Sequence, residues 1–271
     1  TAKKHGVKPI LGCEVYVAPE SRHEKKSKDN LRDASYHLIL LCENDTGYKN
    51  LLRLITKGYL EGFYYKPRID KELLAEYSEG LIALSSCIRG EVAHNVNREN
   101  VPRATKVAAQ YAEIMGPNNF FLELQNHGLE NQDRINNDIV GIGKKLDIPI
   151  VATNNCHYLD KKDFRAHEIL LCLQTGKTIN DPYRMQYPKD EFYFKSPEEM
   201  AEIFKETPEA IENTVKIAER CNVELEFDKL NLPDYPVPES YTLETYLEEI
   251  SREGLKGRFG ELEKLGVDFD K

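Results

Sequence analysis

The stretch Pro149–Tyr158, PIVATNNCHY, decides the fold class of this chain. Its short apolar run, residues 150–152, ends abruptly in two amides, a thiol and an imidazole. Parallel strands that are buried on both faces read as continuous apolar runs. The stretch therefore predicts a buried parallel strand whose carboxyl end opens into a site.

Three other segments repeat this pattern. Residues 9–14 read PILGCE, residues 80–87 read GLIALSSC, and residues 119–127 read NFFLELQNH. Each apolar run ends in a thiol, a carboxylate or an imidazole. Several strands that deliver ligand-type side chains at one end are typical of an α/β barrel with its chemistry on the C-terminal face. We therefore expect an α/β fold with a site at the ends of its strands.

The composition is that of a globular protein without strong nucleic-acid affinity of its own. The 271 residues can bury a sizeable core, and the formal net charge of -9 disfavours non-specific binding to phosphate backbones. The sequence contains no apolar run of membrane-spanning length and no recognisable signal peptide, so we expect no membrane association. None of the six cysteines is paired as CxxC, which favours a reducing, cytoplasmic location over a disulfide framework.

The chain changes character near residue 176. Strand-like and helix-like segments alternate before it, which predicts βαβ units and a parallel sheet, and mostly helical segments follow it. Residues 1–6, TAKKHG, read as the last turn of a helix, so we expect the chain to begin inside an element. Residues 232–238, LPDYPVP, form a Pro-rich connector to a charged amphipathic helix over 242–263.

Particular element boundaries follow from apolar periodicity and capping residues. Asp45 is a candidate N-cap for the helix that follows it, and Ser196, Pro197 and Glu199 form a clear helix start. The expected strands cover residues 9–18, 36–42, 80–85, 119–125, 148–153 and 191–195. The expected helices cover residues 45–61, 70–77, 88–97, 102–115, 130–146 and 161–174, with two more starting after Ser196 and Thr207.

Five residues form the candidate site: Glu14, His37, Cys87, Asn155 and His157. Imidazole, thiolate and carboxylate ligands suit zinc or manganese. Each residue alone also has a structural interpretation: a hydrogen-bonded histidine, a surface carboxylate or a core cysteine. Their shared position at one predicted end of successive strands favours a metal site.

Two further residues, Glu123 and His127, are weaker candidates, because His127 precedes Gly128 and a turn role is as good an explanation. The sequence contains no Gly-rich phosphate loop and no serine nucleophile elbow.

Taken together, several segments resemble one family in order along the chain. They are KPILGCEVYVAP, YHLILLCEN, GYKNLLRLIT, GLIALSSCIRGEV, FFLELQNHG, IPIVATNNCHYL, ENTVKIAERCNVELEF and LPDYPVPESYTLETYL. These segments resemble the polymerase-and-histidinol-phosphatase (PHP) domain of bacterial DNA polymerase III alpha subunits. The last two lie beyond the barrel, which separates this chain from a stand-alone histidinol-phosphate phosphatase.

The resemblance implies a distorted (β/α)7 barrel with a zinc, manganese or magnesium cluster at one end. Glu14 matches the family's glutamate, His37 a later histidine, Cys87 the cysteine and His157 the closing histidine, while Asn155 stands at the aspartate position. The family's first two ligand motifs, HxH and an Asp-His pair, would lie upstream of this chain. We therefore expect an incomplete barrel without its first strands and with weak metal binding, because an amide brings no charge to offset repulsion between cations.

The resemblance also implies a function. Residues 1–230 would be a truncated PHP domain, and residues 231–271 would lead toward a polymerase core that carries the catalytic carboxylates. The chain would then be an inactive scaffold within a DNA-directed DNA polymerase. The alternatives are an active metal-dependent 3′–5′ exonuclease or phosphoesterase, and a docking module for the proofreading exonuclease subunit. The implied partners are that subunit, other replicase subunits and, through the parent polymerase, DNA.

Overall fold

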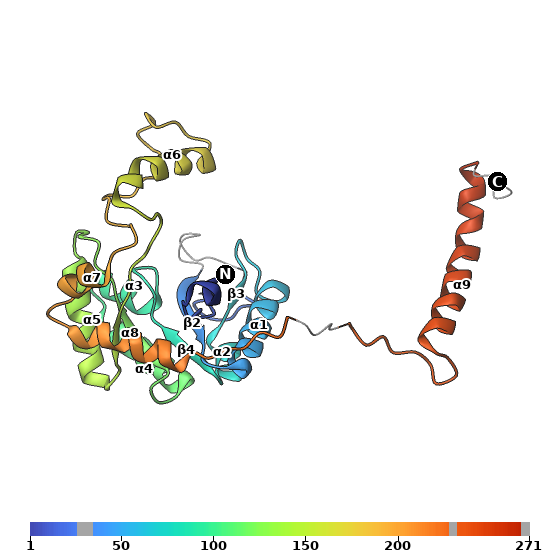
Figure 1. Cartoon of the computed structure of the whole chain (residues 1–271), viewed down its shortest axis with the longest axis horizontal. Coiled ribbons are helices and arrows are strands. Elements are labelled where there is room, and N and C mark those ends of the chain that lie inside the picture. The colour runs from blue at the N-terminus through green and yellow to red at the C-terminus, as the bar shows by residue number, and fades with distance from the viewer. Residues whose placement is uncertain (26–34, 228–231, 267–271) are drawn as a thin grey trace. The chain divides into compact units, whose positions relative to one another are not determined.

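The computed structural model describes residues 1–25, 35–227 and 232–266. The chain divides into two compact units, residues 1–224 and residues 225–271 (Figure 1). The sheet and helices α1–α8 belong to the first unit, and the second contains α9 (Leu243–Lys264). The expected boundary between residues 230 and 231 lies outside the described residues. No helix in the described part of the chain is long and apolar enough to cross a membrane.

One mixed sheet forms the centre of the first unit, and the expected α/β fold is confirmed. Its strands are β1 (Gly12–Val17), β2 (Tyr36–Cys42), β3 (Arg68–Ile69), β4 (Leu81–Leu84), β5 (Phe120–Leu124) and β6 (Ile150–Ala152). They pair in the order β3-β1-β2-β4-β5-β6, and in the described residues this sheet is open rather than closed into a barrel.

The prediction of a wholly parallel sheet is wrong for one strand. β2 runs antiparallel to both of its neighbours, β1 and β4, whereas β3 pairs with β1, β4 with β5 and β5 with β6 in parallel. A parallel neighbour needs a long crossover, usually a helix. The described part of the segment between β1 and β2 contains no helix, so an antiparallel return is the simpler connection.

Helices surround the sheet (Figure 1). Those of the first half are α1 (Asp45–Leu60), α2 (Lys71–Glu76), α3 (Glu91–Asn97), α4 (Val101–Met115) and α5 (Gln132–Leu146). Those of the second half are α6 (Phe164–Thr175), α7 (Pro197–Ile203) and α8 (Pro208–Arg220). The described residues of this unit also contain the short 3-10 turns η1 (Ala2–His5) and η3 (Lys161–Asp163).

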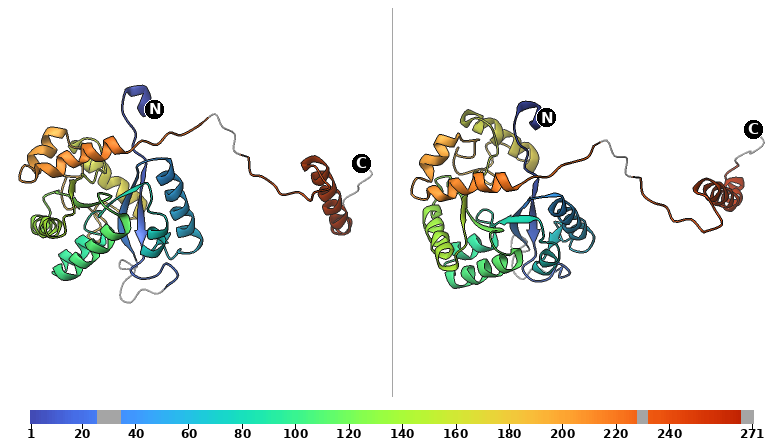
Figure 2. Two further views of the ribbon diagram at one scale, coloured as in Figure 1. Left: turned by 90° about the horizontal axis from the view of Figure 1, so that it is seen from below. Right: turned by 60° about the horizontal axis from the view of Figure 1, so that its bottom comes forward.

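The two faces of the sheet are packed differently, because successive side chains of a strand point to opposite faces. From β2, Leu38 and Leu40 enter the main core, which also contains residues of α1–α5. Ile39 and Leu41 of the same strand point to the other face, where a smaller apolar cluster includes Ile217 of α8. Figure 2 shows α8 (orange) crossing the sheet on the side opposite to α3 and α4.

Helix starts follow local hydrogen bonding. Ser196 and Glu199 form the predicted capping box at the start of α7. Asp45 is not the N-cap of α1, because Asn44 occupies that position and its side chain accepts a hydrogen bond from the Gly47 amide. The strand expected over 191–195 is reduced to one bridge, between Tyr158 and Tyr193.

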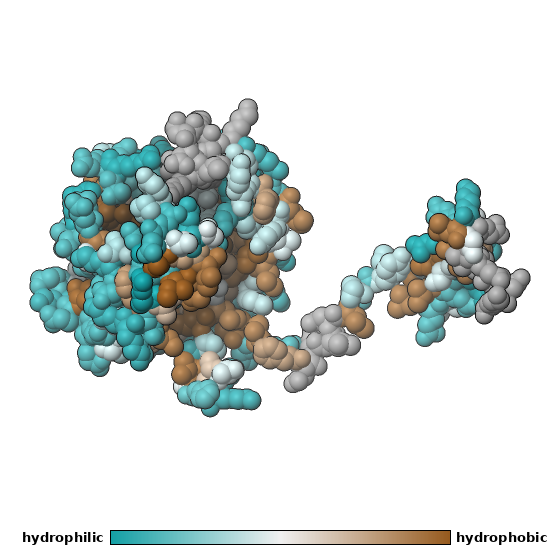
Figure 3. Space-filling view, turned by 90° about the horizontal axis from the view of Figure 1, so that it is seen from above, coloured by the Kyte–Doolittle hydropathy of each residue, from teal (hydrophilic) through white to brown (hydrophobic). Residues whose placement is uncertain are grey.

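Helix α6 leaves part of its apolar surface uncovered. Leu170 and Leu173 are 61% and 73% exposed, and Ile169 is 47% exposed. Figure 1 shows α6 projecting from the rest of the first unit, and Figure 3 shows apolar residues gathered on the face seen from that side. Exposed apolar patches of this kind mark interaction surfaces.

Candidate functional site

The five predicted site residues come from four strand regions. Glu14 lies inside β1 rather than at its end, which corrects the expectation, and His37 lies at the beginning of β2. Cys87 follows β4, and Asn155 and His157 follow β6. Because β2 is antiparallel to β1 and β4, its beginning lies at the same edge of the sheet as the carboxyl ends of β4, β5 and β6.

Glu14 and His37 form a direct pair across two strands. The register places Tyr16 opposite His37 and Glu14 opposite Ile39, so Glu14 and His37 are diagonal neighbours on one face. His37 Nδ1 lies 2.9 Å from Glu14 Oε1, and the Tyr16 ring meets the imidazole edge-on. The contact with His37 lowers the pKa of the Glu14 carboxyl, against the opposing effect of its partial burial.

His37 also reaches Cys87. Burial lowers the pKa of His37, but the Cys87 thiol and the Glu14 carboxylate together raise it to about 9. The imidazole is only 8% exposed, and neither ring nitrogen makes a hydrogen bond of normal geometry with any described residue. The ring therefore lies within range of both partners but is aligned with neither.

The described residues do not form a metal cluster by themselves. Metal sites in proteins use three or more converging ligands, and a cluster needs several negative charges. No group of three or more His, Cys, Asp or Glu side chains in the described ranges is placed to hold a metal ion. Asn155 brings no charge, and His157 has other neighbours. The metal role of the five residues remains a prediction.

His157 belongs to an aromatic group rather than to the Glu14–His37 pair. Its Nε2 lies 3.0 Å from the Tyr187 hydroxyl, and its ring centroid lies 5.6 Å from that of His167. Partial burial lowers the pKa of His157, and the neighbouring His167 lowers it further. Tyr187 lies between His157 and Cys87. Burial raises the pKa of the Tyr187 phenol, and the nearby Cys87 raises it further.

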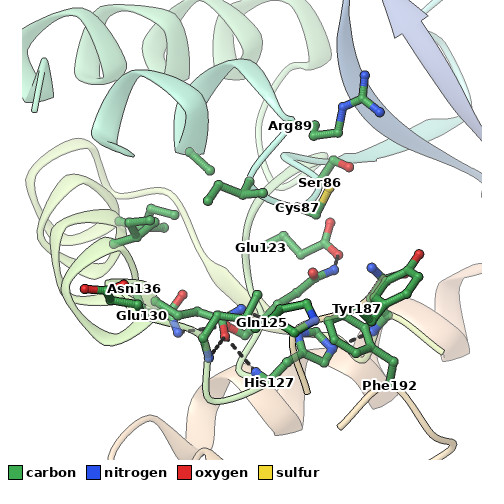
Figure 4. Close-up of a pocket in the computed structure, with 18 of the residues that line it drawn as sticks. Ser86, Cys87, Arg89, Glu123, Gln125, His127, Glu130, Asn136, Tyr187 and Phe192 are labelled. Carbon is green, nitrogen blue, oxygen red and sulfur yellow. Dashed lines mark hydrogen bonds between the residues drawn. The ribbon is translucent and has the colours of Figure 1, made fainter. Parts of the chain in front are cut away.

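A cavity of about 410 Å³ opens beside these groups. Its lining includes two of the predicted residues, Cys87 and Asn155, together with the weaker candidates Glu123 and His127. Tyr187 and Phe192 complete one wall (Figure 4). Sequence reasoning missed both aromatic residues as cavity residues. Tyr187 comes from a segment without regular periodicity, and Phe192 lies in the segment expected as a strand over 191–195.

Glu123 has a buried carboxyl group, of which one oxygen accepts hydrogen bonds and the other accepts none of normal geometry from the described residues. Thr153 Oγ1 and Gln125 Nε2 both donate hydrogen bonds to Oε1. Oε2 has no hydrogen-bond partner among the described residues, although the Ser86 amide is close enough to favour the charged form. Burial raises the pKa of Glu123 above its ordinary value, and the hydrogen bonds oppose that effect. Figure 4 shows the carboxyl directed toward Ser86 and Cys87.

His127 is held as a neutral ring. Its Nε2 accepts a hydrogen bond from the Asn155 amide at 3.3 Å, and the ring stacks in parallel on Phe192 at a centroid distance of 4.4 Å. Burial, followed by the positive charge of Lys195, lowers the pKa of His127 to about 4. His127 therefore serves as a fixed wall of the cavity at neutral pH.

Comparisons with known proteins show what the chain is similar to. The PHP domain family matches residues 1–127. The DNA polymerase III subunit alpha of Borreliella burgdorferi is 46% identical over 263 residues, which covers 96% of this chain and 23% of that protein. The corresponding subunits of Treponema pallidum and Thermus aquaticus are 43% and 44% identical, each over 94% of this chain and over 22% and 21% of their own lengths. The chain thus spans less than a quarter of these relatives. Residues 1–127 therefore match the PHP domain family, and nearly the whole chain is similar to the corresponding part of DNA polymerase III alpha subunits.

Proposed function

We propose that this chain is the PHP region of the catalytic subunit of a replicative DNA polymerase, and that this region acts as a scaffold with an incomplete metal site. The observation that carries the proposal is similarity to alpha subunits over nearly the whole chain. The parent protein would synthesise DNA, and its polymerase carboxylates would lie outside this region. Zinc, manganese or magnesium would bind weakly here.

The scaffold role is supported by the contacts at the strand ends. Glu14 and His37 pair with each other, and His157 pairs with Tyr187. Side chains engaged in this way are not arranged as free metal ligands. Asn155 adds an amide where a carboxylate would be needed for charge balance.

Two activity assays test this proposal. In primer extension, the 271-residue chain is expected to add no nucleotide, while a full-length alpha subunit serves as the positive control. In a nuclease assay on single-stranded DNA with Mn²⁺, we expect no release of nucleotides. Nucleotide release that disappears in His157→Ala would establish instead the alternative, an active metal-dependent phosphoesterase.

Helix α6 favours a second role, docking of another replicase subunit such as the proofreading exonuclease. Leu170 and Leu173 are exposed on this helix, and burial of one leucine side chain stabilises an interface by about 1.5–3 kcal/mol. Capture of the purified proofreading subunit is expected to fail for Leu170→Asp and to persist for the control Leu60→Asp, since Leu60 is an exposed leucine on α1. Equal capture by both variants would exclude α6 as the docking surface.

A further inference from the structure

The end of α1 and the loop that follows it carry exposed aromatic rings. Tyr59, Phe63 and Tyr65 are between 49% and 65% exposed, and the rings of Tyr59 and Phe63 stack with their centroids 6.3 Å apart. Figure 1 shows α1 on the side of the first unit away from α5, and the views in Figure 2 agree. This surface is therefore separate from the cavity that α5 lines. Large exposed rings that lie together mark a binding surface.

The loop holds Tyr65 in a defined position. Tyr65 has a φ of 58°, in the left-handed region that residues other than Gly and Asn seldom adopt. The Tyr64 amide donates a hydrogen bond to the Lys66 carbonyl across this turn. At the base of the loop, the buried Arg68 donates to the Gly62 carbonyl, and its guanidinium lies 5.0 Å from the centre of the Tyr64 ring. A ring that is already held in place loses little conformational freedom when a ligand binds to it.

The same segment carries an excess of positive charge. Residues 46–68 contain five basic residues against one acidic residue, although the whole chain has 46 acidic and 37 basic residues. The basic residues are Lys49, Arg53, Lys57, Lys66 and Arg68. The first three lie four residues apart on one side of α1, which spaces them by about 6 Å along the helix axis. The acidic residue, Glu61, already pairs with Arg22 and Lys57.

Exposed rings together with basic residues fit one class of ligand better than its rivals. Single-stranded nucleic acids stack their bases on aromatic side chains, while basic residues contact their phosphates. A duplex keeps its bases inside and cannot stack them on these rings. A proline-rich peptide would use the rings without the cations. Because the net charge of -9 opposes long-range attraction, binding here depends on stacking as well as on the local cations.

We propose that the loop over residues 61–67 and the exposed side of α1 form a binding surface for single-stranded DNA. Bases stack on Tyr59, Phe63 and Tyr65, and phosphates lie along the basic residues of the same segment. The surface needs no metal ion and none of the residues at the strand ends. Only the choice of DNA over RNA rests on the proposed function, because the proposed parent protein synthesises DNA.

The ligand test measures fluorescence anisotropy of a labelled oligo(dT) strand with the 271-residue chain, at low salt and with a chelator. The comparison strand has the same length and abasic sugars, so it keeps the phosphates and lacks the bases. We expect the abasic strand to bind at least about fivefold more weakly, because stacking contributes at each base. Equal binding of the two strands, or no binding of oligo(dT), would overturn the proposal. Tighter binding of the corresponding RNA strand would overturn the assignment to DNA. Neither metal nor primer extension enters this assay, so its failure is separate from a failure of the proposed function.

The first variant removes one ring. Tyr65→Asn keeps a residue that tolerates the left-handed backbone, and the matched control is Tyr183→Asn, at a tyrosine that is 89% exposed elsewhere in the first unit. We expect Tyr65→Asn to weaken binding of oligo(dT) by about fivefold, to leave binding of the abasic strand unchanged, and Tyr183→Asn to change neither. Equal losses in the two variants would contradict the site.

The second variant removes one cation. Lys66→Gln should weaken binding of both strands and reduce the slope of log affinity against log salt by about 0.7. The control is Lys144→Gln, at an exposed lysine of α5. An unchanged salt dependence in Lys66→Gln would contradict a phosphate contact at this residue. Circular dichroism checks that the variants fold, and the comparison of the two strands on the unaltered chain decides the question if a variant does not.

Discussion

The two faces of the central sheet contrast sharply, although the same strands build both. Leu122 of β5 is fully buried in the main core, and the adjacent Glu123 carries a buried carboxyl on the opposite face. On β2, Leu38 packs in the core while its neighbour His37 pairs with Glu14. The alternation of a strand thus places residues for stability and residues for chemistry one position apart. Substitutions on the core face should therefore lower stability, whereas substitutions on the other face should change how stability depends on pH.

The largest effect is expected on the core face. Leu122→Ala should lower the free energy of unfolding by about 2–5 kcal/mol, because it removes buried methyl groups and leaves a cavity. Urea denaturation measures the loss. The control Leu60→Ala, at a side chain that is 81% exposed, should change stability by less than about 0.5 kcal/mol. A similar loss of unfolding free energy in both variants would contradict the difference between core and surface.

On the site face, His37 should make stability depend on pH in the alkaline range. Its pKa is raised to about 9, so the stabilising contact is fully present below the unfolded value near 6.5 and is lost as pH rises through 9. We expect the free energy of unfolding to fall by about 2 kcal/mol across this window. Denaturation curves at several pH values test this, and Glu14→Gln should flatten the dependence. A flat profile for the unaltered chain would show that the pair does not form.

His127 should act in the opposite direction on the acidic side. Its pKa is lowered to about 4, so the unfolded chain binds a proton between pH 6.5 and 4 while the folded chain does not. Stability should therefore fall by about 1–2 kcal/mol as pH decreases through this window. The difference between the unaltered chain and His127→Gln isolates this contribution from that of the carboxylates. Parallel curves for the two proteins would contradict a buried neutral ring.

The smallest effect concerns the N-terminal caps of α7 and α8. Ser196→Ala removes the side-chain cap of α7 and should cost about 1 kcal/mol. Thr207→Ala is the matched control, because Thr207 is the N-cap of α8 but makes no capping hydrogen bond with its side chain. Thermal unfolding should separate the two variants by a few degrees. Equal midpoints would mean that the capping box at Ser196 contributes nothing measurable.

Local sequence signals predicted most of the elements. The apolar runs before Cys87 and before Asn155 gave strands, and Ser196 with Glu199 gave a helix start, because each signal depends only on neighbouring residues. The choice between Asn44 and Asp45 as N-cap could not be made, since both side chains can cap and only the backbone geometry distinguishes them.

The pairing of segments that are distant in the sequence could not be predicted. The direction of β2 depends on its neighbours in space, and an apolar run has no direction of its own. The same limit applies to the site: Glu14 and His37 were chosen as separate candidates, but their contact follows from the antiparallel register. Tyr187 comes from an irregular segment, and no local pattern indicates that it reaches His157.

The most direct test of the incomplete metal site is a metal analysis of the chain itself. The 271-residue protein would be incubated with Mn²⁺ or Zn²⁺, dialysed into metal-free buffer and measured by mass spectrometry of the elements. We predict much less than one equivalent of bound metal, with no difference between the unaltered chain and His37→Ala. Retention of one or more equivalents that His37→Ala removes would contradict this prediction and establish a working metal centre.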